Sequence, residues 1–138
     1  MAINNTPYED DECIAFSAWL KLNHIPHTHI PNESKGNRPT DRRRQAKMKA
    51  MGQAKGFWDY LVFIPFKGIS DEIDTYQLVA IEMKRQKGGT TSEAQKTWQE
   101  VYEKSGLPAK VCKGAAEAIR FVECILKGEG DGEFSGGN

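Results

Sequence analysis

The pattern of apolar and polar positions along the chain predicts four helices and four strands. Helices are predicted over residues 8–23, 41–51, 92–105 and 115–126. Strands are predicted over residues 24–31, 59–64, 76–84 and 109–112. The first strand contains prolines, which favour a sheet edge. This order predicts one α/β domain over residues 1–127, followed by a flexible, acidic and glycine-rich tail at 128–138.

Two helices carry recognisable start signals. Thr40 is placed to cap the predicted helix at 41–51, which is rich in basic residues, and Gly52 follows the last residue of that helix. Ser92 opens a later helix, and Gln95, three residues on, completes a capping box. Capping alone is a sufficient role for Gln95. Between the two central strands, residues 67–75 are acidic and rich in turn formers, which predicts a loop.

The two central strands carry acidic residues at their ends. Glu82 and Lys84 project from the face opposite to the apolar side chains, because strand side chains alternate. A chance ion pair at an exposed strand end would explain this pattern, and so would a metal site. Asp59 begins the preceding strand, so pairing of the two strands would bring Asp59 and Glu82 together. Two carboxylates in one pocket suit a hard cation such as Mg²⁺.

Composition excludes several classes of protein. The 138 residues are 38% hydrophobic and 28% charged, which fits one globular domain with its own core. Residues 1–11 lack the features of a signal peptide, and no apolar run is long enough to span a membrane. Cys13, Cys112 and Cys124 are scattered and odd in number, which favours a reducing, cytoplasmic location over a disulfide framework.

Charge is segregated along the chain although the net charge is zero. Residues 35–55 contain eight bases and one acid, whereas residues 1–34 contain five acids and one base. A basic stretch of this kind can bind the phosphates of a nucleic acid. A solvated helix face would show the same run of charge.

Glu12 and two histidines are further candidates for a site. Glu12 lies four residues before Phe16 and seven before Trp19, so it shares the inward face of the first helix. It lies either at the rim of the core or toward a site. His27 and His29 share one face of the first strand and could bind zinc, but no cysteine or third ligand lies nearby in the sequence. Exposed or core-rim histidines are the simpler interpretation.

Four stretches, in order, carry a family resemblance: Ile30-Pro31-Asn32-Glu33, Met51 to Asp59, Ile81-Glu82-Met83-Lys84 and Ser92 to Trp98. With the order of elements, they resemble the PD-(D/E)XK nuclease superfamily and, within it, the VRR-NUC family. The likeness covers about residues 9–126. One position departs from the family pattern, which usually has proline before the first catalytic aspartate. This chain has Trp58 there, and tryptophan can also begin a strand.

The resemblance implies a PD-(D/E)XK core, with a central mixed four-stranded sheet flanked by helices. It implies a Mg²⁺- or Mn²⁺-dependent DNA nuclease in which Asp59 and Glu82 bind the metal and Lys84 orients or activates the attacking water. It makes Glu12 the helix-borne acid near the metal and Gln95 a further catalytic residue. We expect DNA contacts from polar and basic residues in and around the basic stretch: Asn32, Lys35, Arg38, Arg42, Arg43, Arg44, Lys47, Lys55, Arg85 and Lys87.

Small stand-alone proteins of this type resemble Holliday-junction resolvases, which act as homodimers. We therefore expect a homodimeric endonuclease that cuts branched DNA during recombination and repair, in a bacterial or phage-infected cell. The alternatives are a flap or nicking nuclease, or a non-catalytic DNA-binding module on the same fold.

Overall fold

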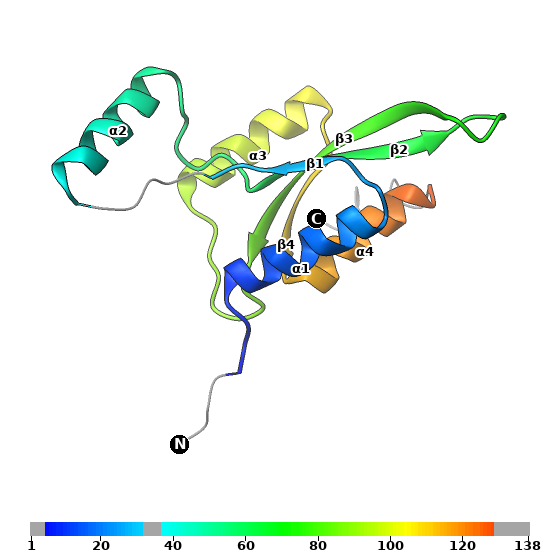
Figure 1. The fold of residues 1–138 in the computed structure, drawn as a ribbon, viewed down its shortest axis with the longest axis horizontal. Coiled ribbons are helices and arrows are strands. Elements are labelled where there is room, and N and C mark those ends of the chain that lie inside the picture. Colours follow the sequence, from blue (N-terminus) through cyan, green and yellow to red (C-terminus); the bar gives the residue numbers. More distant parts are fainter. Residues whose placement is uncertain (1–4, 32–36, 129–138) are drawn as a thin grey trace.

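Two long antiparallel strands form the centre of the fold (Figure 1). The structure is a computed structural model, and it describes residues 5–31 and 37–128. The elements are α1 (Glu9–Leu22), β1 (His27–His29), α2 (Pro39–Ala50), β2 (Tyr60–Lys67), β3 (Ile73–Lys84), α3 (Glu93–Ser105), β4 (Ala109–Lys113) and α4 (Ala115–Leu126).

The sheet is mixed, with the strand order β1-β2-β3-β4. Strand β2 pairs antiparallel with β1 and with β3, and β3 pairs parallel with β4. This arrangement confirms the predicted α/β class with a central mixed four-stranded sheet between helices. The register places Tyr60 opposite Ile81, so the residue before β2, Asp59, lies beside Glu82 near the end of β3.

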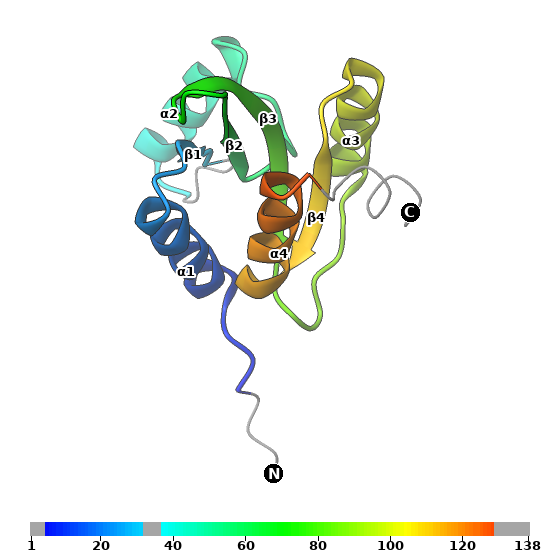
Figure 2. The same ribbon diagram turned by 90° about the vertical axis from the view of Figure 1, so that its right-hand side faces the viewer.

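Each face of the sheet is covered by different helices. On one face, Val62, Ile81 and Met83 are fully buried against α1 and α4. On the other face, Ala80 packs with Trp58 and with Tyr102 of α3. Figure 2 shows α1 and α4 on one side of the sheet and α3 on the other. Each fully buried Val, Ile or Met side chain contributes about 1.5–3 kcal/mol, so packing on both faces fixes the two central strands.

The β2–β3 hairpin is longer than the sequence predicted. Residues 67–75 were expected to form a loop, but β2 continues to Lys67 and β3 begins at Ile73. The pairing of Phe66 with Thr75 extends the ladder through a mixture of apolar and polar residues. The acidic residues and turn formers of this stretch conceal its strand character in the sequence. Asp71, with a φ of 66°, lies in the short turn that remains.

Helix α2 begins two residues earlier than predicted, and the prediction that Thr40 caps it is wrong. Arg38 holds the N-cap position, and Pro39 follows in the first turn. Proline favours this place because its fixed φ suits a helix and the first turn needs no N–H donor from it. Asp41 is the one buried residue of α2, and it pairs with Arg38 and Arg44 at 3.2 Å each. Figure 1 shows α2 set apart from the sheet.

The other elements agree with the sequence within a few residues. Strand β1 is shorter than the predicted 24–31, and it lies at the sheet edge as its prolines indicated. Cys13, Cys112 and Cys124 all lie within the described ranges, and none of them is joined in a disulfide bond there. Within the two described ranges, none of the helices combines the length and the apolar character needed to cross a membrane. The predicted tail lies outside the described residues except for Gly128.

Candidate metal centre

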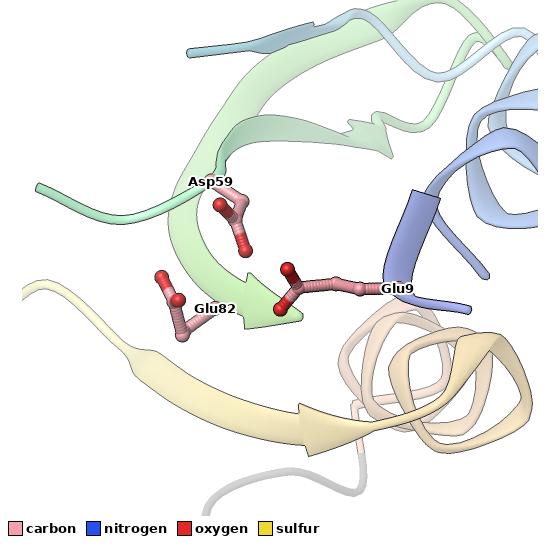
Figure 3. A group of neighbouring side chains, drawn as sticks. All are labelled: Glu9, Asp59 and Glu82. Atoms are coloured by element: carbon pink, nitrogen blue, oxygen red, sulfur yellow. The ribbon is translucent and has the colours of Figure 1, made fainter. Parts of the chain in front are cut away.

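Three carboxylates from three different elements converge at one end of the sheet. Figure 3 shows Asp59 just before β2, Glu82 near the end of β3 and Glu9 at the start of α1, with their carboxyl groups facing one another. One oxygen of each residue lies within 4.8 Å of the corresponding oxygens of the other two. The structure therefore brings Asp59 and Glu82 together as the sequence predicted, and it adds Glu9.

Backbone contacts hold Asp59 in place. Its Oδ2 accepts a hydrogen bond from the backbone N–H of Met83 at 2.7 Å, so the side chain is attached to the neighbouring strand. Its own carbonyl accepts a hydrogen bond from the N–H of Ile30 at 2.6 Å, which attaches it to the segment after β1. Asp59 is thus fixed from both sides before any ligand binds.

Lys84 and Gln95 surround the carboxylate of Glu82. Lys84 Nζ lies 3.4 Å from Glu82 Oε1, and the Lys84 side chain is only 12% exposed. Lys84 Nζ also donates to Gln95 Oε1 at 3.0 Å, while Gln95 Nε2 donates to Glu82 Oε1. The three side chains therefore form a closed network on the α3 face of the sheet.

The predicted capping box is present and serves this same network. Ser92 Oγ accepts from Gln95 N at 3.1 Å, and Gln95 Oε1 accepts from Ser92 N at 3.0 Å. The Gln95 side chain therefore caps α3 and contacts Lys84 and Glu82 at once. The capping role and the site role, which the sequence left as alternatives, are compatible.

The electrostatics of the pocket disfavour the charged carboxylates. Burial raises the pKa of Asp59 above its ordinary value, although the hydrogen bond from Met83 opposes this. Burial, followed by the negative charge of Asp59, raises the pKa of Glu82 to about 8. A buried carboxylate beside a half-buried one cannot ionise cheaply unless a positive charge compensates the pair.

The donor set fits a hard divalent cation. Glu82 Oε2 is buried and has no hydrogen-bond partner among the described residues. A buried carboxylate oxygen without a donor is costly, and a cation would remove that cost. Carboxylate oxygens are the ligands that Mg²⁺ and Mn²⁺ prefer. Glu9, Asp59 and Glu82 are therefore the residues that could hold such an ion.

Glu12 has other partners and does not belong to this cluster. It is buried, its Oε1 accepts from the N–H of Ala115 at 3.2 Å, and its Oε2 accepts from Gln86 Nε2 at 3.0 Å. Ala115 is the first residue of α4, so Glu12 places its charge at a helix N-terminus. Gly114, with a φ of 94°, leaves room, because a Cβ there would lie 2.8 Å from Glu12 Oε2.

Glu9, and not Glu12, is the acid of α1 that lies beside Asp59 and Glu82 in the structure. Sequence reasoning missed Glu9 because an acid in the first turn of a helix is already explained by the helix dipole. The available signal was its spacing, three residues before Glu12 and thus near the same helix face. The role of Glu12 at a metal stays a prediction that the geometry does not favour.

The predicted DNA-binding residues have different surroundings. Arg38 and Arg44 are paired with Asp41, while Arg42, Arg43 and Lys47 are exposed on α2. Lys55 and Lys87 are exposed in connecting segments. Asn32 and Lys35 lie outside the described residues, as does Glu33.

Arg85 contacts the chain itself. Its guanidinium donates to the carbonyls of Thr6 at 2.8 Å and Pro7 at 3.1 Å, and it lies 4.9 Å from the centre of the Tyr8 ring. These contacts hold the segment that leads into α1, and Glu9 begins that helix. Arg85 therefore helps to fix the position of Glu9, and its role in DNA binding stays a prediction.

The histidines do not form a zinc site with each other in the part of the chain that the structure describes. His27 uses both ring nitrogens, at 2.8 Å from Ser17 Oγ and at 2.8 Å from the carbonyl of Ile25. The ring of His29 packs edge-on against Tyr60, with centroids 5.1 Å apart. The charge of His29 acts to lower the pKa of Asp59, so His29 lies near the carboxylate cluster.

Comparison with known proteins identifies the fold. No family model matches the chain, and no curated protein matches it. A solved structure named "VRR_NUC domain protein" is similar with a TM-score of 0.64 and 23% sequence identity, over 89% of this chain and 91% of that chain. At this identity the likeness shows a common fold. It agrees with the PD-(D/E)XK-like core that the sequence predicted.

The raised pKa of Glu82 gives a stability prediction for the protein without metal. Between about pH 4.5 and 8, Glu82 is ionised in the unfolded protein and still protonated in the folded protein. Rising pH therefore favours the unfolded state, and the free energy of unfolding of the wild type falls. Glu82→Gln removes this loss. In the presence of a chelator we expect the variant to melt about 4 °C or more above the wild type at pH 8, roughly 1 kcal/mol. We expect a clearly smaller difference at pH 5.

Thermal unfolding followed by circular dichroism at the two pH values measures this difference. Glu100→Gln removes an exposed carboxylate of α3 and controls for the loss of one charge. An equal gain for Glu82→Gln at both pH values would mean that Glu82 does not titrate across this range.

Proposed function

We propose that this protein is a metal-dependent DNA endonuclease of the VRR-NUC type. The observation that carries this proposal is the cluster of three carboxylates, in which the buried Glu82 has an oxygen without a donor among the described residues and Lys84 lies alongside. The shared fold with a solved VRR_NUC domain protein supports it. The exposed bases of α2 provide a surface for phosphates.

The side chains have distinct tasks in phosphodiester hydrolysis. Attack by water adds negative charge to phosphate oxygens. A divalent cation held by Glu9, Asp59 and Glu82 would offset that charge and lower the pKa of bound water. Lys84 adds a fixed positive group at the same place and orients the attacking water. Gln95 holds the Lys84 ammonium and the Glu82 carboxylate in fixed positions relative to each other through its two hydrogen bonds.

Removing either central carboxylate should abolish cleavage. We expect Asp59→Ala and Glu82→Ala to lose DNA cleavage in Mg²⁺ by a factor of about 10³ or more, because each removes a ligand of the ion. DNA binding should be largely retained, since the exposed bases are unchanged. A nuclease assay with Mg²⁺ or Mn²⁺ and a gel-shift assay with Ca²⁺ measure the two properties separately.

Two further variants sharpen this test. Glu100→Ala changes an exposed carboxylate on α3 and should cleave normally. Lys84→Ala should lose most activity and keep its affinity for the ion by calorimetry. Full cleavage by Asp59→Ala or Glu82→Ala would remove the assignment of the metal centre. If the wild type cleaves no DNA with either Mg²⁺ or Mn²⁺, the result would favour a DNA-binding module on the same fold.

The exposed arginines of α2 should set the salt dependence of DNA binding. Arg42 and Arg43 have no acidic partner in the described part of the chain, whereas Arg44 is held by Asp41. Each phosphate that the protein no longer neutralises should reduce the slope of log affinity against log salt by roughly 0.9 on duplex DNA. We therefore expect Arg42→Ala with Arg43→Ala to flatten the slope measurably. Arg120→Ala on α4 is the matched control, and an unchanged slope in the double variant would mean that α2 is only solvated.

A homodimer that prefers four-way junctions to linear duplex is the finer part of the proposal. The described residues of one chain provide one carboxylate cluster. Resolution of a junction needs two incisions, and twofold symmetry supplies both. Sedimentation at micromolar concentration measures the oligomeric state. Parallel cleavage of junction, flap, nicked and linear DNA measures preference. A monomer that cuts junction and linear DNA at equal rates would exclude the resolvase, whereas preference for flaps or nicks would select one of the alternative nucleases.

A further inference from the structure

The residue before Asp59 connects that strand to α3. Trp58 is fully buried, and its indole Nε1–H donates a hydrogen bond to the backbone carbonyl of Gln95 at 3.2 Å. Its ring packs edge-on against Tyr102, which lies further along α3, with centroids 5.3 Å apart. Trp58 therefore contacts α3 by a directed hydrogen bond as well as by packing.

A second contact lies two residues earlier in the same segment. Gly56 has a φ of 77°, and a Cβ at this position would lie 2.4 Å from Ala94 Cβ and 2.9 Å from the Ala94 carbonyl carbon. Such contacts are too close for any side chain, so the backbone at Gly56 lies directly against the first turn of α3. The segment 56–58 thus meets α3 at two successive residues, Ala94 and Gln95.

The residue that Trp58 contacts is the one that organises the site network. The Gln95 side chain accepts from Lys84 Nζ and from Ser92 N, and it donates to Glu82. An amide with this many partners functions only if its backbone is placed correctly relative to β3. The Trp58 hydrogen bond joins that backbone to the segment that ends in Asp59.

We propose that Trp58 is a positioning residue for hydrolysis, which acts through Gln95 to orient Lys84 and Glu82. This inference rests on the proposed nuclease function for its kinetic consequence. Its structural consequence, the placement of the Gln95 amide, holds in the protein without metal or DNA. The competing interpretation is that Trp58 only fills the aromatic cluster of Phe57, Trp98 and Tyr102.

A double-mutant cycle separates the two interpretations. Trp58→Phe keeps an aromatic ring against Tyr102 and removes the indole N–H. Gln95→Ala removes the amide contacts with Lys84 and Glu82 and keeps the carbonyl that Trp58 binds. If Trp58 acts through the Gln95 side chain, its effect on turnover disappears once that side chain is gone, whereas its effect on stability remains.

We expect Trp58→Phe to lower kcat about tenfold, with little change in KM for DNA. A displaced Gln95 amide would leave Lys84 and Glu82 misaligned in the transition state. In the Gln95→Ala background, the same substitution should change kcat by less than about twofold. Multiplicative losses in the double variant would overturn the proposal. Trp98→Phe is the matched control, because it makes the same chemical change in the same cluster at a residue without a hydrogen bond to Gln95.

A second readout does not depend on cleavage. In metal-free protein, the NMR resonances of the Gln95 side-chain amide should shift in Trp58→Phe and stay in place in Trp98→Phe. Unchanged Gln95 resonances in Trp58→Phe would overturn the proposal even if turnover falls. If the wild type does not cleave DNA, the proposed function fails, and these resonances alone decide whether Trp58 positions Gln95.

If Trp58→Phe does not fold, site-specific replacement of Trp58 by benzothienylalanine serves the same purpose. This analogue keeps the bicyclic shape and lacks the N–H donor, so packing is preserved while the hydrogen bond is removed. We expect the same loss of kcat and the same shift of the Gln95 amide resonances. Wild-type values for both in this variant would assign Trp58 to packing alone.

Discussion

The repulsion between two adjacent carboxylates, one buried and one half-buried, is the constraint around which the site is built. Asp59 and Glu82 lie side by side because β2 and β3 are in register, and burial raises the pKa of both. The surrounding groups compensate only part of this cost: the Met83 N–H binds Asp59, and Lys84 binds Glu82. Under the proposed function, a divalent cation would offset the cost that these groups leave uncompensated.

The two cores of the domain keep this pocket from relaxing. Val62, Ile81 and Met83 anchor the central strands to α1 and α4, while Ala80 lies beneath Trp58 and Tyr102 on the α3 side. The carboxylates cannot move apart unless the strands that carry them separate from one of these cores. Close-packed protein interiors are stiff, and this stiffness holds like charges together in the folded protein.

Local rules predicted the parts of the site that depend on local structure. Strand alternation put Glu82 and Lys84 on one face, and the capping box located Gln95 at the start of α3. Tertiary contacts decided the rest. Glu9 and Glu12 lie near the same face of α1, and only the positions of α4 and Gln86 determine that Glu12 is satisfied while Glu9 faces Asp59. No periodicity in α1 contains that information.

Burial alone does not identify a functional carboxylate in this chain. Asp41, Glu12 and Glu82 are all buried, with exposures of 3%, 6% and 2%. Asp41 is neutralised by two arginines, and Glu12 by a helix N-terminus and an amide. Glu82 differs because one of its oxygens has no donor among the described residues although Lys84 and Gln95 are within reach of the other. A buried carboxylate oxygen without a donor is costly, and this cost is the feature that supports the proposed binding site over a purely structural ion pair.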